Sequence, residues 1–341
     1  MNICSKTFAT KSLTKFIATA VLAIGLAAAL LLPGAARAEG ERPQGERPKI
    51  VATTGMVADL VRAVAGDRAA VEALMGEGVD PHLFKPTRSD TVKLLRADAV
   101  FISGLHLEGK MTAAFDRLRE SGKPVVALGD AVPKERLLSP PEFEGAHDPH
   151  IWMDVGIWAS TLPSIRDGLT RLDPAGAEAY ARNADAYGAE LARLDAYARR
   201  ILSSIPGKAR VLVTAHDAFN YLGRAYGIEV RGIQGISTES EAGLRIIEEL
   251  AALLADRGVP AVFPETSVSD RNVRALVEGA GARGHRVTLG GALFSDAMGA
   301  PGSYEGTYIG MIDHNVTTIA RALGGEAPAG GFQGKLALAQ R

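Results

Sequence analysis

The sequence of 341 residues contains only one cysteine and no excess of basic residues. A single cysteine excludes a disulfide framework and any zinc site built from several cysteines. Lysine and arginine number 38, aspartate and glutamate number 39, and the net charge is −1. Because no basic excess is present to neutralise a phosphate backbone, the composition argues against nucleic-acid binding.

Two common enzyme motifs are also absent. The chain has no Gly-x-Ser-x-Gly turn, the signature of α/β-hydrolases, and no His-Glu-x-x-His pair, the commonest zinc-peptidase pattern. Hydrophobic residues make up 47% and charged residues 23% of the chain, which is ordinary for a globular protein. The length predicts about two domains.

Only one long apolar run occurs, and it lies near the N-terminus. Phe16 to Leu32 carries no charge, lysines precede it, and Ala36-Arg37-Ala38 follows it. This order is typical of a secretory signal peptide, which we place at residues 1–38, so the mature protein is expected in the periplasm. A membrane anchor is the alternative, since seventeen residues can just span a bilayer. Cys4 precedes the run. A lipoprotein cysteine would follow the run, so Cys4 is not expected to be one.

Strand-like and helix-like segments alternate through most of the remaining chain. Buried strands are expected at 50–53, 99–102, 124–127, 211–214, 228–230, 261–263 and 286–289. Helices are expected at 56–65, 241–256, 271–282 and 307–323. This alternation predicts parallel sheets that are covered by helices on both faces.

A long helix is predicted in the middle of the chain. Asp173-Pro174 is a typical helix start, and no proline follows until after Ser203. About thirty residues at 1.5 Å each give a helix of roughly 45 Å. We therefore predict an α/β fold in which two Rossmann-like parallel-sheet lobes are joined by a long backbone helix. The expected parts are a flexible leader at 39–48, an N-terminal lobe at 49–172, a linking helix at 173–205, a C-terminal lobe at 206–324 and a loose tail at 325–341.

The sequence contains Asp-Pro-His twice, as Asp80-Pro81-His82 and Asp148-Pro149-His150. A neutral imidazole is a good zinc or manganese ligand, and a neighbouring carboxylate can fix its tautomer. Proline stiffens the turn, which lowers the entropy lost when the ligand is held in place. Each motif alone could equally be a capped turn.

Two further candidate ligands lie in the second half of the chain. His216 follows the strand that ends at Thr214, and Asp296 follows the last predicted strand. Because ligands bind beyond the carboxyl ends of strands in open α/β sheets, these residues can meet His82 and His150. His285 and His314 lie in no motif and are expected to be structural. His147 is close to His150 in sequence and is a competing or transient ligand.

Five segments together resemble the solute-binding receptors of zinc and manganese ABC importers, over about residues 50–323. They are Asp80 to Thr87, Gly104 to Glu108, Asp148 to Asp154, Thr214 to Phe219 and Leu293 to Gly299. The resemblance implies that the metal ligands are His82, His150, His216 and Asp296. It also implies two similar lobes with the metal buried between them, little hinge closure, and delivery of the ion to a permease in the inner membrane by a monomer.

The choice of metal rests on the ligand set. Three imidazoles and one carboxylate suit Zn²⁺, whereas more carboxylate suits Mn²⁺, so zinc is favoured and manganese is the alternative. The stretch from Lys134 to Asp148 contains only His147, whereas many zinc receptors of the family carry a loop rich in His, Asp and Glu there. This difference weakens the preference for zinc slightly.

Two other functions remain open at this stage. A zinc-dependent hydrolase could use the same ligands with Glu265 as a base, although Glu265 could equally support a neighbouring ligand or the fold. A surface adhesin is a label used in this family, and no residue specifically supports it. We expect no enzyme, because four protein ligands close the metal shell. Asp296, in a loop of small residues before Gly299, is the ligand expected to move on metal release.

Overall fold

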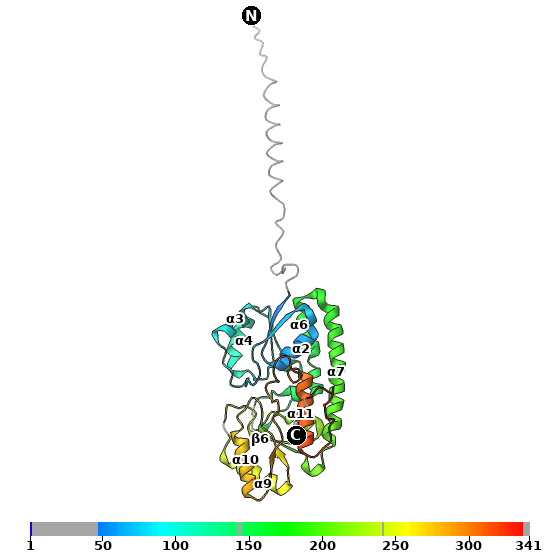
Figure 1. The fold of residues 1–341 in the computed structure, drawn as a ribbon. Coiled ribbons are helices and arrows are strands. Elements are labelled where there is room, and N and C mark those ends of the chain that lie inside the picture. The colour runs from blue at the N-terminus through cyan, green and yellow to red at the C-terminus, as the bar shows by residue number, and fades with distance from the viewer. Residues whose placement is uncertain (2–46, 142–144, 241, 337–341) are drawn as a thin grey trace. The chain divides into compact units, whose positions relative to one another are not determined.

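The computed structural model describes Met1 and residues 47–141, 145–240 and 242–336. The predicted signal peptide and most of the predicted leader lie outside these residues. Residues 47–336 form two α/β lobes with a long helix beside them, as predicted (Figure 1). Among the described residues, no helix is both long enough and apolar enough to cross a membrane.

The first lobe is built on a parallel sheet of four strands in the order β2-β1-β3-β4. Its strands are β1 (Lys49–Ala52), β2 (Ala70–Ala73), β3 (Ala99–Ile102) and β4 (Val125–Ala127). Its helices are α2 (Gly55–Ala65), α3 (Arg88–Arg96) and α4 (Thr112–Glu120). Strand β2 was not expected, because Ala-Val-Glu-Ala has no apolar run and its residues are only half-buried at the edge of the sheet.

Both faces of this sheet are covered, as the strand–helix alternation predicts. Ile50 and Phe101 face one hydrophobic cluster, whereas Val51 and Val100 face another. Side chains of neighbouring residues in a strand point to opposite faces, so a fully apolar strand fills two cores. The first of these clusters continues into the second lobe.

The second lobe repeats this arrangement. Its strands are β5 (Val211–His216), β6 (Glu229–Gln234), β7 (Ala261–Val262) and β8 (Thr288–Leu289). Parallel pairs β5-β6 and β7-β8 are joined by a parallel bridge between Thr214 and Phe263, which gives the order β6-β5-β7-β8. In each lobe the first strand therefore lies between the second and the third. This is the order in which an α/β sheet has a switch point between its first and third strands.

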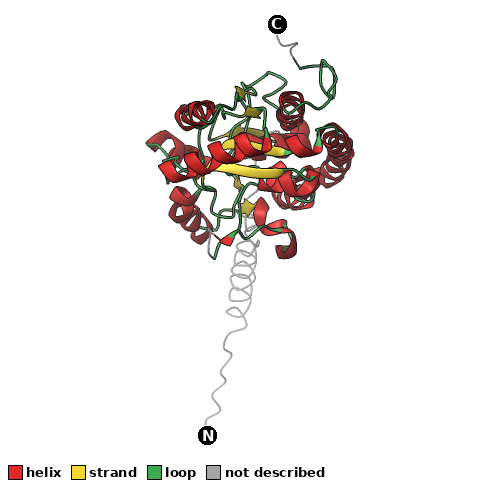
Figure 2. Cartoon of the chain, turned by 90° about the horizontal axis from the view of Figure 1, so that it is seen from below, coloured by secondary structure: helices red, strands yellow, loops and turns green. Residues whose placement is uncertain are grey.

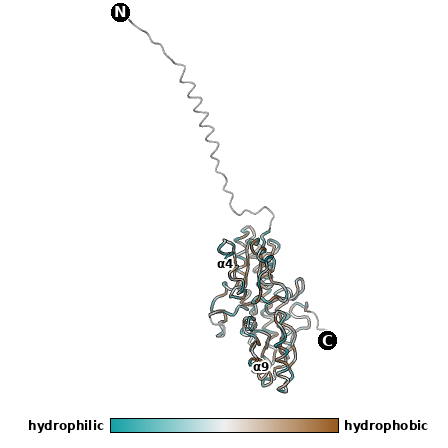
Figure 3. The backbone as a smooth tube through the Cα atoms, turned by 90° about the vertical axis from the view of Figure 1, so that its left-hand side faces the viewer, coloured by the Kyte–Doolittle hydropathy of each residue, from teal (hydrophilic) through white to brown (hydrophobic). Residues whose placement is uncertain are grey.

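The helices of the second lobe are α8 (Asn220–Tyr226), α9 (Leu244–Arg257), α10 (Arg271–Ala282) and α11 (Tyr308–Ala322). Of these, α9 and α10 are amphipathic and α11 is buried on most sides. Helix α9 buries Leu250 and Leu254, and α4 of the first lobe buries Phe115 and Leu118. Hydrophilic and hydrophobic residues alternate along both helices (Figure 3). Seen from below, helices flank the strands on both sides (Figure 2).

Three helices join the lobes: α5 (Val155–Ala159), α6 (Leu162–Leu172) and α7 (Ala177–Ser203). The 27 residues of α7 run along both lobes (Figure 1) and correspond to about 40 Å of helix. Tyr187 in its first half donates a hydrogen bond to Asp59 of α2, and Tyr197 in its second half contacts Thr317 of α11. The long helix is thus hydrogen-bonded to both lobes.

Residues 325–336, part of the expected loose tail, contact the second lobe and α7. The backbone N–H of Phe332 donates to Asp313, its ring packs against Tyr197, and Leu336 is buried. The backbone N–H of Glu326 donates to Ser204 at the end of α7. Residues 325–336 are therefore fixed against the second lobe, because Phe332 packs against Tyr197 of α7 and its backbone binds Asp313 of α11.

Candidate metal centre

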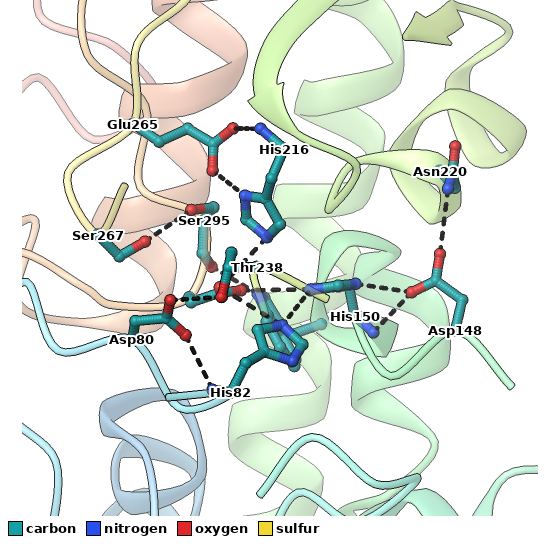
Figure 4. A network of polar contacts seen from close by, with 12 residues as sticks. Asp80, His82, Asp148, His150, His216, Asn220, Thr238, Glu265, Ser267 and Ser295 are labelled. Atoms are coloured by element: carbon teal, nitrogen blue, oxygen red, sulfur yellow. Dashed lines mark hydrogen bonds and ion pairs between the residues drawn. The ribbon is translucent and has the colours of Figure 1, made fainter. Parts of the chain in front are cut away.

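The four predicted ligands come together between the two lobes. His82, His150, His216 and Asp296 each present a ligand atom within 4.8 Å of the others, and all four are buried. His82 and His150 come from the first lobe, whereas His216 comes from the second (Figure 4). Asp296 also belongs to the second lobe, in the segment that follows β8. The arrangement can hold one cation only while the lobes are together.

The first Asp-Pro-His turn follows β2. The Oδ1 atom of Asp80 accepts a hydrogen bond of 2.8 Å from the backbone N–H of His82, which closes a turn around Pro81. The Oδ2 atom accepts a hydrogen bond of 2.6 Å from the hydroxyl of Thr238 in the second lobe. Asp80 therefore fixes the backbone of His82 rather than its ring.

The second Asp-Pro-His turn is held more tightly. Oδ1 of Asp148 accepts from the backbone N–H of His150 at 3.0 Å and lies 2.7 Å from Nδ1 of the same residue. Its other oxygen accepts from Asn220 of the second lobe. In the neutral ring the carboxylate thus places the proton on Nδ1, so that the lone pair of Nε2 can bind a metal.

Glu265 does for His216 what Asp148 does for His150. His216 is the last residue of β5, and Glu265 lies just beyond β7. One oxygen of Glu265 accepts the backbone N–H of His216 at 2.8 Å, and the other accepts the proton on Nδ1. Both oxygens are occupied in this way, so Glu265 orients the ring of His216 and has no unpaired oxygen available as a base.

The loop that carries Asp296 is also fixed. The backbone carbonyl of Ser295 accepts from Nε1 of Trp152, and its hydroxyl contacts that of Ser267. Asn315 bonds both the N–H and the C=O of Phe294. These contacts hold Asp296 in place, and the side chain is buried.

The donor atoms have the spacing that a small cation requires. Nε2 of His216 lies 3.2 Å and Nε2 of His150 lies 3.4 Å from an oxygen of Asp296. Nε2 of His82 lies 3.7 Å from Asp296 and 3.3 Å from Nε2 of His150. A tetrahedral zinc with bonds of about 2.0–2.1 Å places its donors about 3.3–3.4 Å apart. The four side chains therefore already approximate such a shell.

Three atoms at the centre lack hydrogen bonds. Nε2 of His216 and both oxygens of Asp296 are buried, with no hydrogen-bond partner in the part of the chain that the structure describes. The 3.2 Å between His216 and Asp296 is within ion-pair range but does not have hydrogen-bond geometry. Buried polar atoms are normally paired, and a cation between these atoms satisfies all three at once.

Burial and nearby charges shift the pKa values of the three histidines in different directions. Burial lowers the pKa of His82 to about 4. Burial acts in the same direction on His150, but the carboxylates of Asp148 and Asp296 outweigh it and raise its pKa to about 9. Glu265 and Asp296 likewise outweigh burial and raise the pKa of His216 well above its usual value. The pKa of Asp296 is lowered by His216 and His150 in spite of burial.

The other histidines lie elsewhere. His285 contacts the carbonyl of Val259 and His314 that of Ala292, as expected for structural residues. His147 contacts Ser139 and lines a cavity of about 290 Å³ with His106, outside the cluster of four.

The residues that reach across the cleft were not predicted. Asn220 and Thr238 bond the two motif aspartates from the second lobe, and Trp152 bonds the Asp296 loop from the first. Asn220 lies four residues beyond His216, and a polar residue so close to a candidate ligand is a signal that the sequence offers. No sequence pattern marks Thr238.

The chain is similar in sequence to known metal-binding proteins. The family model "ZnuA: Zinc-uptake complex component A periplasmic" matches residues 50–322. The chain is similar to manganese-binding lipoprotein MntA of Bacillus subtilis, with 43% identity over 89% of this chain and 98% of the relative. It is also similar to zinc-binding protein TroA of Treponema pallidum, with 45% identity over 90% of this chain and 98% of the relative.

The fold agrees with these matches. The structure of the periplasmic zinc-binding protein TroA from Treponema pallidum superposes with a TM-score of 0.79 at 46% identity, covering 82% of this chain and 99% of that chain. The family model spans most of the chain, and its matched region contains all four clustered residues. The chain therefore belongs to the family of the periplasmic component A of zinc-uptake complexes.

Proposed function

We propose that this protein is a periplasmic solute-binding receptor that captures one divalent metal ion and delivers it to an ABC importer in the inner membrane. His82, His150, His216 and Asp296 are its ligands. The observation that carries the proposal is the convergence of three Nε2 atoms on the two unpaired oxygens of Asp296. The ion is the cargo of the protein, and the protein acts as a monomer.

Zinc is the favoured cargo, and manganese is the second. Three imidazoles with one carboxylate form a typical zinc shell. Both oxygens of Asp296 face the histidines, at 3.4 Å from His150 and 3.2 Å from His216, so the carboxylate can also bind through two oxygens. That mode offers the higher oxygen content that manganese prefers. Support for both metals also comes from similarity to a zinc-binding and a manganese-binding relative.

The geometry favours a receptor over a hydrolase. A catalytic zinc normally has three protein ligands and an open position for water, whereas four ligands are present here. Glu265, the candidate base, uses both oxygens to hold His216. We therefore propose no catalytic role for any of these residues.

Two measurements test the function. Protein purified from its native periplasm is analysed for metal by mass spectrometry, and we expect one equivalent of zinc, or of manganese. A strain that lacks the gene is then grown under zinc or manganese starvation, and we expect a growth defect for the cargo metal only. Metal-free native protein together with unimpaired growth in both media contradicts the proposal.

A further inference from the structure

The two Asp-Pro-His turns hold their histidines to different degrees. His150 is fixed at its backbone N–H and at its ring by Asp148. His82 is fixed by Asp80 at its backbone N–H. The side chain of His82 is 5% exposed, whereas those of the other three ligands are fully covered. His82 is thus the ligand nearest to solvent.

Each motif aspartate also reaches the second lobe through its other oxygen. Asp148 accepts a bond of 3.2 Å from Asn220, and Asp80 accepts a shorter bond of 2.6 Å from Thr238 (Figure 4). Beside Thr238, Glu239 forms an ion pair of 3.0 Å with Lys110 of the first lobe. The turn after β6 therefore bridges the lobes next to the most exposed ligand.

From these contacts we infer that Thr238 is a positioning residue that acts through Asp80 to hold His82 at the metal, and that His82 is the ligand withdrawn when the ion leaves. This inference rests on the proposed function. Separation of the lobes breaks the Thr238–Asp80 bond. Asp80 and His82 then move together, because the bond between them lies within one lobe and does not span the cleft.

The alternative, that Asp296 moves first, requires more bonds to break. Its loop is held by Trp152, Ser267 and Asn315, and Asn315 alone contributes two hydrogen bonds. His216 is held twice by Glu265. The loop before Gly299 is therefore not the pliable element that its small residues suggest, and the weakest support in the shell is the single hydroxyl of Thr238.

The test is the rate of zinc release into excess chelator, measured by stopped flow on the full mature protein. Thr238→Val removes the hydroxyl and keeps the shape, and Thr238→Ser retains the hydroxyl. Because a hydrogen bond to a charged acceptor is lost, we expect Thr238→Val to release zinc about tenfold faster, while Thr238→Ser stays close to wild type. The spectrum of the Co²⁺-loaded protein stays the same in all three, since the four ligands are unchanged.

Asn220→Ala is the matched control, because it removes the cross-lobe contact of the Asp148 side chain but leaves His150 held at backbone and ring. We expect a smaller acceleration than for Thr238→Val. Hydrogen exchange in Thr238→Val should increase around His82 and not at 293–299. If Thr238→Val folds poorly, as judged by thermal unfolding, Thr238→Ala replaces it at the same position.

Three results overturn the inference: release from Thr238→Val at the wild-type rate, equal acceleration in Asn220→Ala, or faster exchange centred on 293–299. Each of them leaves the proposed function intact, provided that wild-type protein binds one equivalent of zinc. Failure of the wild type to bind zinc contradicts the proposed function itself, so the two failures are distinguishable.

Discussion

Nε2 of His216 lies 3.2 Å from Oδ2 of Asp296, and within the described residues neither atom has a hydrogen-bond partner. Both atoms are fully buried. The protein without metal therefore carries unsatisfied polar atoms on the second-lobe side of its cleft, and an ion bound to them and to His82 and His150 would join the two lobes.

Metal should accordingly stabilise the fold. A ligand that binds only the native state at about 100 times its Kd adds about 2.7 kcal/mol, which is worth roughly 5 °C in a protein of this size. Thermal unfolding with and without one equivalent of zinc measures the shift, and excess chelator should reverse it. An unchanged Tm at saturating zinc counts against the site.

Loss of a ligand should weaken binding strongly. Asp296→Asn keeps the shape and removes the charge that faces three imidazoles, and we expect at least about a hundredfold weaker zinc binding, since the ion loses its one anionic partner. Competition with a chromophoric chelator gives the Kd. His106→Ala is the control, because that exposed residue lies outside the cluster. Equal affinities of the two variants contradict the assignment.

Glu265 should matter through the tautomer of His216. In Glu265→Gln the amide oxygen can accept one of the two protons that Glu265 now accepts, and its NH₂ group faces the other. When the NH₂ group of the glutamine faces Nδ1, it donates to that nitrogen. The proton of the ring then lies on Nε2, the atom directed at the metal. We expect zinc affinity to fall about 10- to 100-fold. An affinity within error of wild type means that the carboxylate only supports the fold.

Metal binding should release protons. The carboxylates that face His150 and His216 raise their pKa values, to about 9 for His150, so both rings are protonated in the metal-free protein at pH 7. The ion binds the neutral rings and must displace these protons, so affinity falls as the pH falls below about 9. His82, whose pKa burial lowers to about 4, is already neutral and contributes no proton.

Calorimetry at pH 7 in buffers of different ionisation enthalpy counts the protons, and we expect about two per zinc ion. The direct binding profile between pH 6 and 9 should rise with pH. A flat profile with no proton release removes His150 and His216 from the shell.

The long helix should limit hinge motion. Tyr187 of α7 and the backbone N–H of Tyr308 both donate to the half-buried carboxylate of Asp59, which ties the helix to both lobes. Tyr187→Phe leaves that carboxylate with one partner fewer, and we expect about 1–3 kcal/mol less stability in urea unfolding. Zinc affinity should stay at the wild-type value, because no ligand is contacted. A loss of affinity without a loss of stability contradicts this role.

The sequence predicted the helix at 271–282 and the long helix well, because strong periodicity and a proline start are local signals. The four clustered residues were also predictable, since each lies in a short motif near a strand end. Strand β2 was missed because an edge strand needs no apolar run, and β8 is only the end of the expected segment 286–289. The contacts of residues 325–336 are long-range, so local patterns do not reveal them.

Cross-lobe contacts are the part that local patterns cannot supply. The bond between Thr238 and Asp80 joins residues 158 positions apart, and that of Trp152 with Ser295 joins residues 143 apart. The second-lobe residues of these pairs, Thr238 and Ser295, share no sequence motif with Asp80 and Trp152. The same holds for the Asp296 loop, because its small residues suggest freedom and the hydrogen bonds that oppose it come from residues distant in the sequence.

The central claim is that one metal ion lies among His82, His150, His216 and Asp296. Anomalous diffraction at the zinc edge, from crystals of zinc-loaded mature protein, tests it most directly. The account predicts one strong peak with three Nε2 atoms and at least one Asp296 oxygen at about 2.0–2.2 Å. A main peak elsewhere, such as beside His106 and His147, with none between the lobes would contradict it.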